Sequence, residues 1–471
     1  MRIYFLGICG SAMGNVALLM RSLGHEVIGA DTGIYPPMSD NLIKNNVQIH
    51  EGYDADRLDK ISPDLIVIGN ALSRGNPEIE YILESRKFRF ISMAELLSEQ
   101  ILSQRHNIVV TGTHGKTTTT ALAAFLLNSQ GVDAGYMIGG IPKDFPLGSA
   151  MGSAAAPFVI EGDEYDTAFF DKRSKFIHYN PKILVINNIE FDHADIFRDL
   201  IDIKRSFTHL VRLIPRNGYI LLNGDDANVL EVTQTTYCNT FTVGFGDHDL
   251  KISDFIEHAT GSSFRFIWQG KPWAVVDWNL SGAYNARNLA MAALASALSI
   301  YPNDPTRFPI DSVKNFKGVK RRQEVLHQEA SLVLIEDFGH HPTAIKEVLA
   351  SLRQKYPDHR ITACFEPRSN TAAINIHQEE LANALSSADT AFIAPIHRLE
   401  SIPEGKRLST KMLESNLKNC RAFVDFDSLY DSLRELERSP AKQLVCFFSN
   451  GTLGGVMQKW TEQLNLTPQS V

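Results

Sequence analysis

Short apolar segments alternate with helix-forming segments along most of the 471-residue chain, and this alternation limits the folds open to it. The apolar segments are rich in β-branched and aromatic residues, as in RIYFLGI (2–8), NIVVTG (107–112) and LVLIEDFG (332–339). Such strands between helices are typical of parallel α/β sheets. Because ligands of these sheets bind outside the carboxyl ends of the strands, we expect functional residues in the loops that follow them.

The length predicts about three domains, at roughly 150 residues each. We expect them to span residues 1–105, 106–320 and 321–471, because a polar segment (103–106) and a basic segment (316–322) interrupt the pattern. One stretch, 251–280, alternates apolar and polar residues around Gln269-Gly270, which predicts an antiparallel hairpin in the central domain. The central sheet should therefore be mixed.

Composition excludes several classes of protein. The chain has 46 basic and 54 acidic residues, a net charge of −8, which argues against nucleic acid or an anionic membrane as partner. It has no apolar run long enough for membrane insertion. Five scattered cysteines without a CxxC pair favour reduced thiols and a cytoplasmic location over a disulfide framework or a zinc site. These features leave the oligomeric state open.

The string TGTHGKTTT (111–119) follows an apolar strand and opens a helix-forming run, the context of a phosphate-binding loop. Backbone N–H groups of a glycine-rich turn at a helix N-terminus bind polyphosphate. We expect Lys116 to reach the β- and γ-phosphates and the Thr117 hydroxyl to bind Mg²⁺. Val110 stands where the strict motif has its first glycine, and a plain glycine turn is the alternative interpretation.

Acidic strings end two further strands of the central block, at 158–164 (FVIEGDE) and at 187–193 (NNIEFDH). Carboxylates at neighbouring strand ends suit Mg²⁺ bound together with a nucleotide. Caps for the following helices are the alternative. At the N-terminus, GICGSAMG (7–14) is a broken dinucleotide fingerprint and Asp31 ends the next strand, which indicates a phosphate or nucleotide-sugar site or only a structural turn.

Six motifs occur in an order typical of one family: GTHGKTTT, EGDEYD, NNIEFDHADIF, GAYNARN, KRRQE and DFGHHPTA. The chain resembles the Mur ligases, which are ATP-dependent amide ligases of peptidoglycan synthesis. The resemblance implies an α/β fold of three domains: a Rossmann-like UDP-sugar domain, a central P-loop ATPase domain with a mixed sheet and a Rossmann-like C-terminal domain for the incoming amine.

The resemblance also implies roles for particular residues. ATP would contact Gly112, Thr113, His114, Gly115, Lys116, Thr117, Thr118, Asn288, Arg322 and Asp337, and Lys116, His114 and Arg322 would act in catalysis. Mg²⁺ would be bound by Thr117, Glu161 and His193, and the UDP-sugar by Gly10, Ser11, Ala12, Met13, Asp31 and Asn70.

The strings GICGSAMG, YPPMS, GNALSRGNPE, FFDKRSKFIHY, FEPRSNT and FSNGTLGG resemble the branch of the family that recycles cell-wall peptide. They imply ligation of the tripeptide L-Ala-γ-D-Glu-meso-diaminopimelate to UDP-N-acetylmuramate, with ATP as co-substrate. His341, Arg368, Ser369 and Asn370 would contact the peptide, and the basic cluster 172–175 is a second candidate. The alternatives are an L-alanine ligase, a non-catalytic P-loop switch and an NAD-dependent oxidoreductase.

Three details depart from the family pattern or stay open. Tyr284 stands where a histidine is usual, so packing near the adenine should differ. Lys204 is the only candidate for the carbamylated lysine of many members, but its position fits poorly and the role stays unassigned. The pair His340-His341 has two interpretations, a hinge or amine-side contact and a local helix cap.

Overall fold

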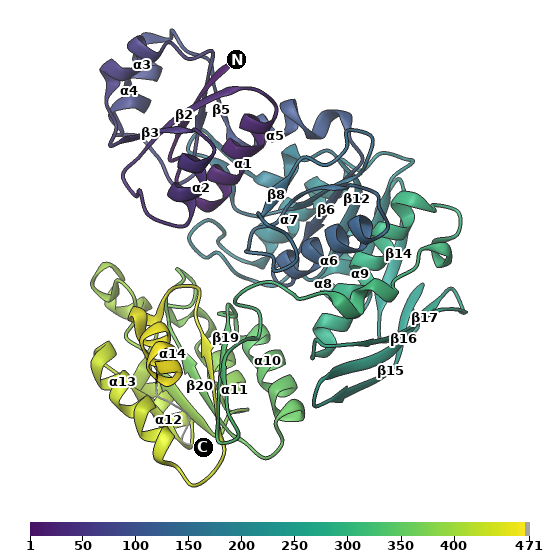
Figure 1. Ribbon diagram of the computed structural model, residues 1–471, viewed down its shortest axis with the longest axis vertical. Helices are drawn as coiled ribbons and strands as arrows, with labels where there is room; N and C mark the ends of the chain where they lie inside the picture. Colours follow the sequence, from purple (N-terminus) through teal and green to yellow (C-terminus); the bar gives the residue numbers. More distant parts are fainter. Residues whose placement is uncertain (467–471) are drawn as a thin grey trace.

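The computed structural model describes residues 1–466 and contains three α/β units in chain order, each built on its own sheet (Figure 1). The N-terminal unit lies at one end of the longest axis, and the C-terminal unit at the other. The predicted α/β class with three layered units is confirmed. The predicted domain boundaries fall in the segments that connect one sheet to the next.

The N-terminal sheet is entirely parallel and has the strand order β3-β2-β1-β4-β5, as expected of a Rossmann-like domain. Side chains cap its later helices: Ser92, for example, forms a capping box with Glu95 at the start of α5. The strands are β1 (Arg2–Leu6), β2 (Glu26–Asp31), β3 (Gln48–Glu51), β4 (Leu65–Ile68) and β5 (Phe90–Ser92), and the helices are α1 (Ser11–Ser22), α2 (Met38–Lys44), α3 (Ala55–Ile61), α4 (Pro77–Ser85) and α5 (Met93–Gln100).

The central sheet is mixed, with the order β17-β16-β15-β14-β13-β12-β6-β9-β7-β8. Helices α6 and α9 cover one face in a shared core, and α7 and α8 cover the other. The strands are β6 (Asn107–Thr111), β7 (Gly135–Met137), β8 (Ser149–Ala150), β9 (Phe158–Glu161), β12 (Pro181–Ile186), β13 (Tyr219–Asn223), β14 (Asn239–Gly244), β15 (Leu250–His258), β16 (Gly261–Trp268) and β17 (Lys271–Trp278). The helices are α6 (Lys116–Ser129), α7 (Leu200–Val211), α8 (Ala227–Val232) and α9 (Ala283–Ile300).

The structure contains the hairpin predicted over 251–280, but the prediction missed one strand beside it. Its turn lies at Gln269-Gly270, where both residues have positive φ (46° and 79°). A third antiparallel strand, β15, precedes it, and a register shift with Asp254 at φ 53° interrupts the alternation there. A separate small hairpin joins β10 (Asp166–Ala168) to β11 (Asp171–Ser174).

The C-terminal sheet has the order β18-β19-β23-β20-β21-β22, in which only β18 is antiparallel. Its strands are β18 (Glu324–Gln328), β19 (Leu332–Asp337), β20 (Arg360–Phe365), β21 (Thr390–Ile393), β22 (Cys420–Ala422) and β23 (Gln443–Phe448). Helices α10 (Pro342–Lys355), α11 (Gln378–Leu385) and α12 (Thr410–Asn416) share one core, and α13 (Phe426–Glu435) and α14 (Val456–Leu466) share the core on the other face.

Short 3₁₀ turns complete the secondary structure, at Leu102–Gln104, Lys175–His178, Pro305–Arg307, Asp311–Asn315, Asn375–His377, Leu399–Ser401, Glu404–Lys406, Leu436–Arg438 and Leu453–Gly455. All five cysteines are free thiols, as predicted. Across residues 1–466, no helix is both long and apolar enough to cross a membrane.

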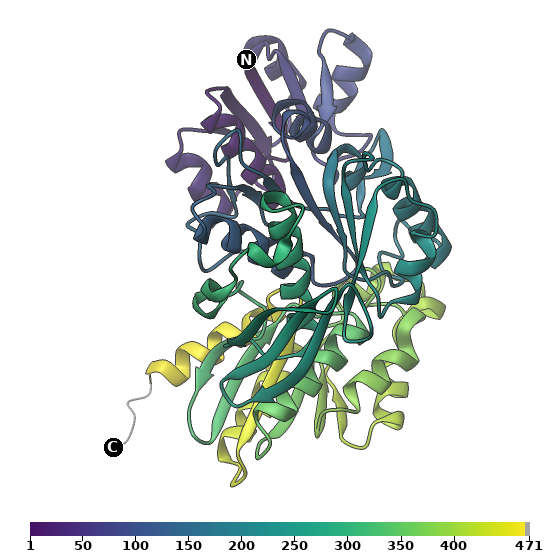
Figure 2. The ribbon, with the colours of Figure 1, turned by 90° about the vertical axis from the view of Figure 1, so that its right-hand side faces the viewer.

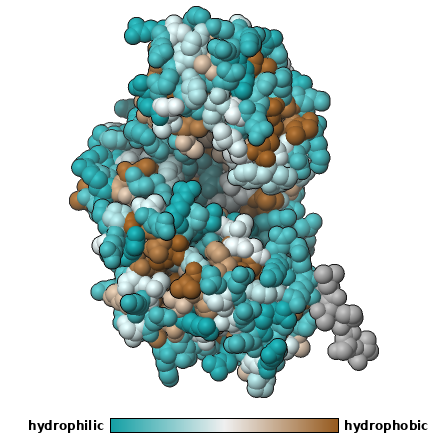
Figure 3. All heavy atoms as spheres, turned by 90° about the vertical axis from the view of Figure 1, so that its left-hand side faces the viewer, coloured by the Kyte–Doolittle hydropathy of each residue, from teal (hydrophilic) through white to brown (hydrophobic). Residues whose placement is uncertain are grey.

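A few side-chain contacts join neighbouring domains. The Ser149 hydroxyl donates to the Asn15 carbonyl of α1 (3.4 Å), and Phe90 packs edge-on against Phe170. On the other side, β15 lies beside α10, where the Ser351 hydroxyl donates to Glu257 (2.8 Å; Figures 1 and 2). Figure 3 shows that the surface is hollowed between the upper and lower parts of the molecule.

Candidate active site

The loop between β6 and α6 depends on two glycines. Gly112 has φ +128° and Gly115 has φ +79°, conformations that favour glycine. A Cβ on Gly115 would lie 2.5 Å from the Asn288 Oδ1, so no larger residue fits there. The N–H of His114 donates to the Asn188 Oδ1 (2.7 Å) and holds the loop in place. The first N–H groups of α6 have no partner within the helix and point to the loop, and anion binding there stays a prediction.

Lys116, the first residue of α6, makes an ion pair that sequence reasoning missed. Its Nζ donates to the Glu164 carboxylate (2.8 and 3.0 Å) and to the Gly112 carbonyl (2.8 Å). Burial alone would lower the lysine pKa, but the charges of Glu164 and the neighbouring acids raise it. Lys116 therefore stays charged, and Glu164 neutralises its charge in this structure.

Two of the three predicted Mg²⁺ ligands meet in the structure. The Thr117 hydroxyl donates to the Glu161 Oε1 (2.9 Å), and the Gly139 N–H donates to its Oε2 (2.7 Å). Burial raises the pKa of Glu161, and in the described part of the chain no cationic side chain forms an ion pair with it. A buried carboxylate next to a hydroxyl fits a hard cation such as Mg²⁺.

His193, the third predicted ligand, faces a different acid. Its Nε2 lies 3.1 Å from the Glu164 Oε1, and its backbone has φ +56°. Burial would lower the pKa of His193, but Glu164 raises it. Glu164 thus links the predicted ligand His193 to Lys116 of the phosphate loop. The motif EGDE contains Glu164, but sequence reasoning did not single it out.

A cavity of about 340 Å³ adjoins the phosphate loop and fits the predicted nucleotide site. The Thr119 hydroxyl donates to the Asn288 Oδ1 (3.2 Å), which places Asn288 at the cavity wall below Gly115. Tyr284 also lines the cavity and accepts a hydrogen bond from Gln323. The lining residues are His114, Gly115, Asn187, Asn188, Glu190, Asn223, Asp225, Asp226, Ala227, Asn228, Tyr284, Arg287, Asn288, Thr343 and Glu347.

The remaining predicted nucleotide residues lie where the central domain meets the C-terminal domain, except Thr118, which is buried in the first turn of α6. The Arg322 guanidinium stacks on Phe338 (4.9 Å) and, within residues 1–466, makes no hydrogen bond or ion pair, so it is available to an anionic ligand. Asp337 is buried and accepts from the Gln323 and Gly339 N–H groups (2.8 and 2.7 Å). Burial raises its pKa, and both contacts lie within the C-terminal domain, where they hold the turn after β19 and the segment before β18.

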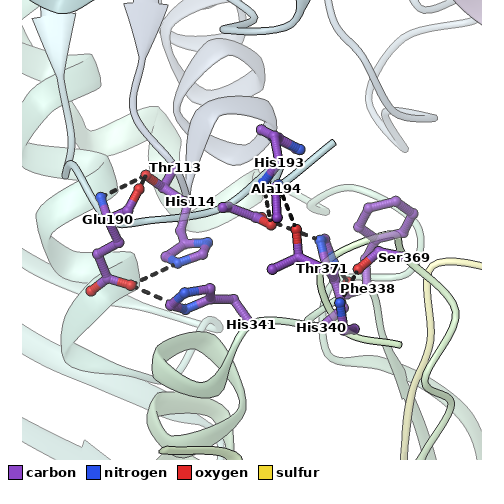
Figure 4. Close-up of polar contacts among 12 residues, drawn as sticks. Thr113, His114, Glu190, His193, Ala194, Phe338, His340, His341, Ser369 and Thr371 are labelled. Carbon is purple, nitrogen blue, oxygen red and sulfur yellow. Dashed lines mark hydrogen bonds and ion pairs between the residues drawn. The ribbon is translucent and has the colours of Figure 1, made fainter. Parts of the chain in front are cut away.

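Two histidines converge on one carboxylate between the central and C-terminal domains (Figure 4). Glu190 Oε2 lies 3.1 Å from the His114 Nε2 and 3.1 Å from the His341 Nδ1. Burial lowers the pKa of His341 to about 3. Burial would raise the pKa of Glu190, but the hydrogen bond from His114 and the neighbouring imidazoles hold it at about 2. Both groups therefore present lone pairs at neutral pH.

The pair His340-His341 forms a local helix cap and also contacts the central domain, and its role as a hinge or amine-side contact stays a prediction. His341 is the N-cap of α10 and its Nδ1 accepts from the Thr343 N–H (3.3 Å), which is a local cap. It also contacts the central domain, since its Nε2 donates to the Phe191 carbonyl (3.2 Å). His340 Nε2 lies 3.6 Å from the Asp192 carboxylate. Burial would raise the pKa of Asp192, but His340 and the neighbouring histidines lower it.

The segment Glu190–Ala194 carries further contacts with the C-terminal domain. The Phe191 carbonyl also accepts from the His377 Nε2 (2.9 Å), and the Ala194 N–H donates to the Thr371 hydroxyl (3.1 Å; Figure 4). Neither His377 nor Thr371 was predicted to lie at the site, although Thr371 ends the motif FEPRSNT. The segment thus brings the metal candidate His193 next to the loop that carries the predicted peptide residues.

That loop follows β20. Arg368 lies 3.5 Å from Glu366, a fully buried carboxylate that also accepts from the Leu453 N–H (3.2 Å). Ser369 accepts from the Ala372 N–H (3.0 Å), and Asn370 is exposed. Arg368 is 35% exposed, so its guanidinium can contact a ligand.

The predicted UDP-sugar residues lie at the carboxyl edge of the N-terminal sheet. Gly10, Ser11 and Ala12 are exposed at the start of α1 and Asn70 is exposed after β4, whereas Met13 is buried. Asp31 accepts from the Cys9 and Gly33 N–H groups (2.8 and 2.9 Å), so its observed contacts fix the loop. Contact with a sugar stays a prediction for all six.

Acidic residues close in sequence already pair with the basic cluster 172–175. Lys172 pairs with Asp166 (2.5 Å), Arg173 with Asp171 (2.8 Å) and Lys175 with Asp163 (2.6 Å). The hairpin's Phe170 packs on Phe90 of the N-terminal domain. Lys204 pairs with Glu231 (2.6 Å), and its role stays unassigned.

Family models match nearly the whole chain: "Mur ligase family, catalytic domain" over residues 2–105, "Mur ligase middle domain" over 110–297 and "Mur ligase, glutamate ligase domain" over 321–451. The chain belongs to the Mur ligase family. The NAD-dependent alternative is therefore wrong.

Within the family, the chain is similar to several named relatives over most of its length. The chain is 39% identical over 467 residues to the UDP-N-acetylmuramate–L-alanyl-γ-D-glutamyl-meso-2,6-diaminoheptandioate ligase of Escherichia coli, covering 98% of each chain. It is similar to the crystal structure of a murein peptide ligase from Psychrobacter arcticus, with a TM-score of 0.72, 34% identity and 99% of both chains covered. The UDP-N-acetylmuramate–L-alanine ligase of Clostridium acetobutylicum is 30% identical, over 89% of this chain and 88% of its own.

Proposed function

We propose that the protein joins the tripeptide L-Ala-γ-D-Glu-meso-diaminopimelate to the lactyl carboxylate of UDP-N-acetylmuramate, with ATP as co-substrate. The observation that carries the proposal is the near-complete coverage of relatives with this activity at 37% and 39% identity. It is supported by a phosphate loop whose lysine is charged, a nucleotide cavity beside it and an arginine loop across the domain junction.

The proposed reaction must bring together two anions, the lactyl carboxylate and ATP. The lactyl carboxylate must attack the γ-phosphorus of ATP to give an acyl phosphate and ADP, and their negative charges must be neutralised first. The N-terminus of α6, Lys116 and Arg322, which forms no ion pair within residues 1–466, supply positive charge and positioning. Thr117, Glu161 and His193 would hold Mg²⁺, which adds further charge neutralisation when bound. A free amine then attacks the acyl carbon, and phosphate leaves as the amide forms.

Binding of the tripeptide requires planar side chains that carry a positive charge. The tripeptide carries several carboxylates and a distal amino-acid centre, which arginine binds in bidentate fashion. Arg368, with one long contact to Glu366, is placed at a strand end for that task, next to Ser369 and Asn370. His341 lies between this loop and the phosphate loop. Closure of the three domains would keep water from the acyl phosphate.

A coupled assay of ADP release over a panel of amines tests the proposal. We expect ADP release to require both UDP-N-acetylmuramate and the tripeptide, with free L-alanine a poor substrate. Comparable kcat/KM values for L-alanine and the tripeptide would assign the protein to the L-alanine-adding step instead. ATP hydrolysis that ignores both substrates would favour a nucleotide-dependent switch.

A further inference from the structure

The His114–Glu190–His341 cluster has a geometry that the ligase reaction does not explain. His114 comes from the phosphate loop, Glu190 from the loop after β12 and His341 from the start of α10, so three separate elements and two domains meet there. One nitrogen of each imidazole and one carboxylate oxygen lie within 4.8 Å of one another. All three side chains are at least partly buried.

The hydrogen bonds of His341 fix its protonation pattern. A carbonyl oxygen can only accept, so the Nε2 that contacts the Phe191 carbonyl carries the hydrogen. The Nδ1 accepts the Thr343 N–H at the helix cap and is therefore a lone-pair donor. Nδ1 also lies 3.1 Å from the Glu190 Oε2, another lone-pair donor. Because an imidazole nitrogen has a single lone pair, a cation on Nδ1 would replace the long Thr343 N–H bond (3.3 Å) and would relieve the close approach of the two acceptors.

We propose that His114, Glu190 and His341 form a binding site for a transition-metal cation of the Zn²⁺ class, separate from the Mg²⁺ site. Two imidazoles and one carboxylate are a ligand set that zinc accepts, leaving a fourth position open. Imidazole ligands select Zn²⁺ over Mg²⁺, which prefers oxygen ligands such as Thr117 and Glu161.

The distances agree with such an ion. At Zn–N and Zn–O bond lengths of about 2.0–2.2 Å, neighbouring ligand atoms of a tetrahedral ion lie about 3.3 Å apart. Both contacts of Glu190 Oε2 already measure 3.1 Å. The two imidazole nitrogens are at most 4.8 Å apart, so they need to approach by no more than about 1.5 Å. A small movement of the C-terminal domain toward the phosphate loop would complete the site.

The site has a direct structural consequence. An ion there joins the phosphate loop to the N-terminus of α10 and so holds the C-terminal domain against the central domain. His114 and Glu190 also line the nucleotide cavity, so the open fourth position lies beside the space for ATP. The ion would therefore favour the closed arrangement of the domains.

Titration of the full-length protein with Zn²⁺ alone, followed by calorimetry, tests the proposal. The background carries Glu161→Gln, so that the Mg²⁺ site does not contribute. The test variants are His341→Asn, which keeps a side-chain acceptor for the helix cap, and Glu190→Gln. The control is His340→Ala, which removes an adjacent histidine outside the cluster.

We expect one Zn²⁺ per chain in the background and in the control, with binding weakened at least tenfold in both test variants, since even outer-sphere changes at metal sites cost about 10–100-fold. Zn²⁺ should also raise the melting temperature of the control but not of the His341→Asn protein. Equal Zn²⁺ affinity in the background and both test variants, or no binding in the background, would overturn the proposal.

Discussion

The Lys116–Glu164 ion pair allows the catalytic and folding roles of the phosphate-loop lysine to be separated. Lys116→Met removes the ammonium group and keeps most of the apolar stem. It leaves the Glu164 carboxylate, with only 3% of its side chain exposed, without its cation. Removing one partner of a buried pair costs about 3–5 kcal/mol. Because His193 still contacts one carboxylate oxygen at 3.1 Å, we expect about 3 kcal/mol, the lower end of that range.

The double variant Lys116→Met/Glu164→Gln removes both charges together. We expect it to recover most of the lost stability, because a neutral amide costs far less to bury than an unpaired carboxylate. Turnover should not recover, since the ammonium that stabilises the transferred phosphoryl group is absent in both variants. That loss is about 3 kcal/mol, on the order of a hundredfold or more in kcat.

Chemical denaturation and the coupled ADP-release assay measure the two effects on the same samples. The lysine variant should be both less stable and inactive, whereas the double variant should be stable and inactive. Recovery of turnover in the double variant would refute the catalytic role of Lys116. Unchanged stability in the single variant would refute the ion pair as a buried one. The phosphate-loop motif alone does not predict this loss of stability, because it does not identify Glu164 as the partner of Lys116.

Three further predictions concern the metal site, the peptide loop and pH. Glu161→Gln, and more weakly His193→Ala, should raise the Mg²⁺ concentration that gives half-maximal rate, because each removes a ligand. Arg368→Ala should raise the KM for the tripeptide about tenfold or more, while the KM for ATP changes little, since its loss removes a cationic contact worth about 1.5–3 kcal/mol. Arg173, then a backbone N–H and His178, hold the pKa of Asp171 at about 2, so its stabilising effect is present above pH 3.8 and is lost as the pH falls toward 2. Melting temperatures of the wild type and Asp171→Asn should accordingly differ at neutral pH and converge in acid.

Each of these has a result that would count against it. A large loss of stability in Glu161→Gln with unchanged Mg²⁺ dependence would support a helix-capping role. An equal rise of both KM values would remove Arg368 from the peptide site, and Arg438→Ala, an exposed arginine on a distant turn, is the matched control. A melting difference for Asp171→Asn that persists unchanged at pH 2 would contradict the assigned cause of the pKa shift.

Local patterns made much of the fold predictable. The apolar strands, the phosphate loop and the turn at Gln269-Gly270 depend on residues close in sequence, and the structure has all three. The third strand of that region escaped prediction because a bulge near Asp254 breaks its alternation, and its turn at 259–260 has no glycine pair. The six family motifs extended the prediction from local structure to the three-domain arrangement.

Side-chain partners were much less predictable. His114, Glu190 and His341 are separated by 76 and 151 residues, so only the folded domains bring them together. The absence of a CxxC pair argued against a zinc site, but that argument considers cysteine ligands and short spacings only. Similarly, Arg173 and Lys175 suggested a peptide-binding cluster, whereas Asp171 and Asp163 already pair with them.

The hydrogen bond between the Ala194 N–H and the Thr371 hydroxyl turns one amide into a reporter of domain motion. Thr371 is buried, and the bond crosses from the central to the C-terminal domain. The same short segment carries the contacts of Glu190 and Phe191, so separation of the domains breaks them together. Exchange of the Ala194 amide hydrogen with solvent would therefore measure how often the domains part, and substrates that hold them together would slow that exchange.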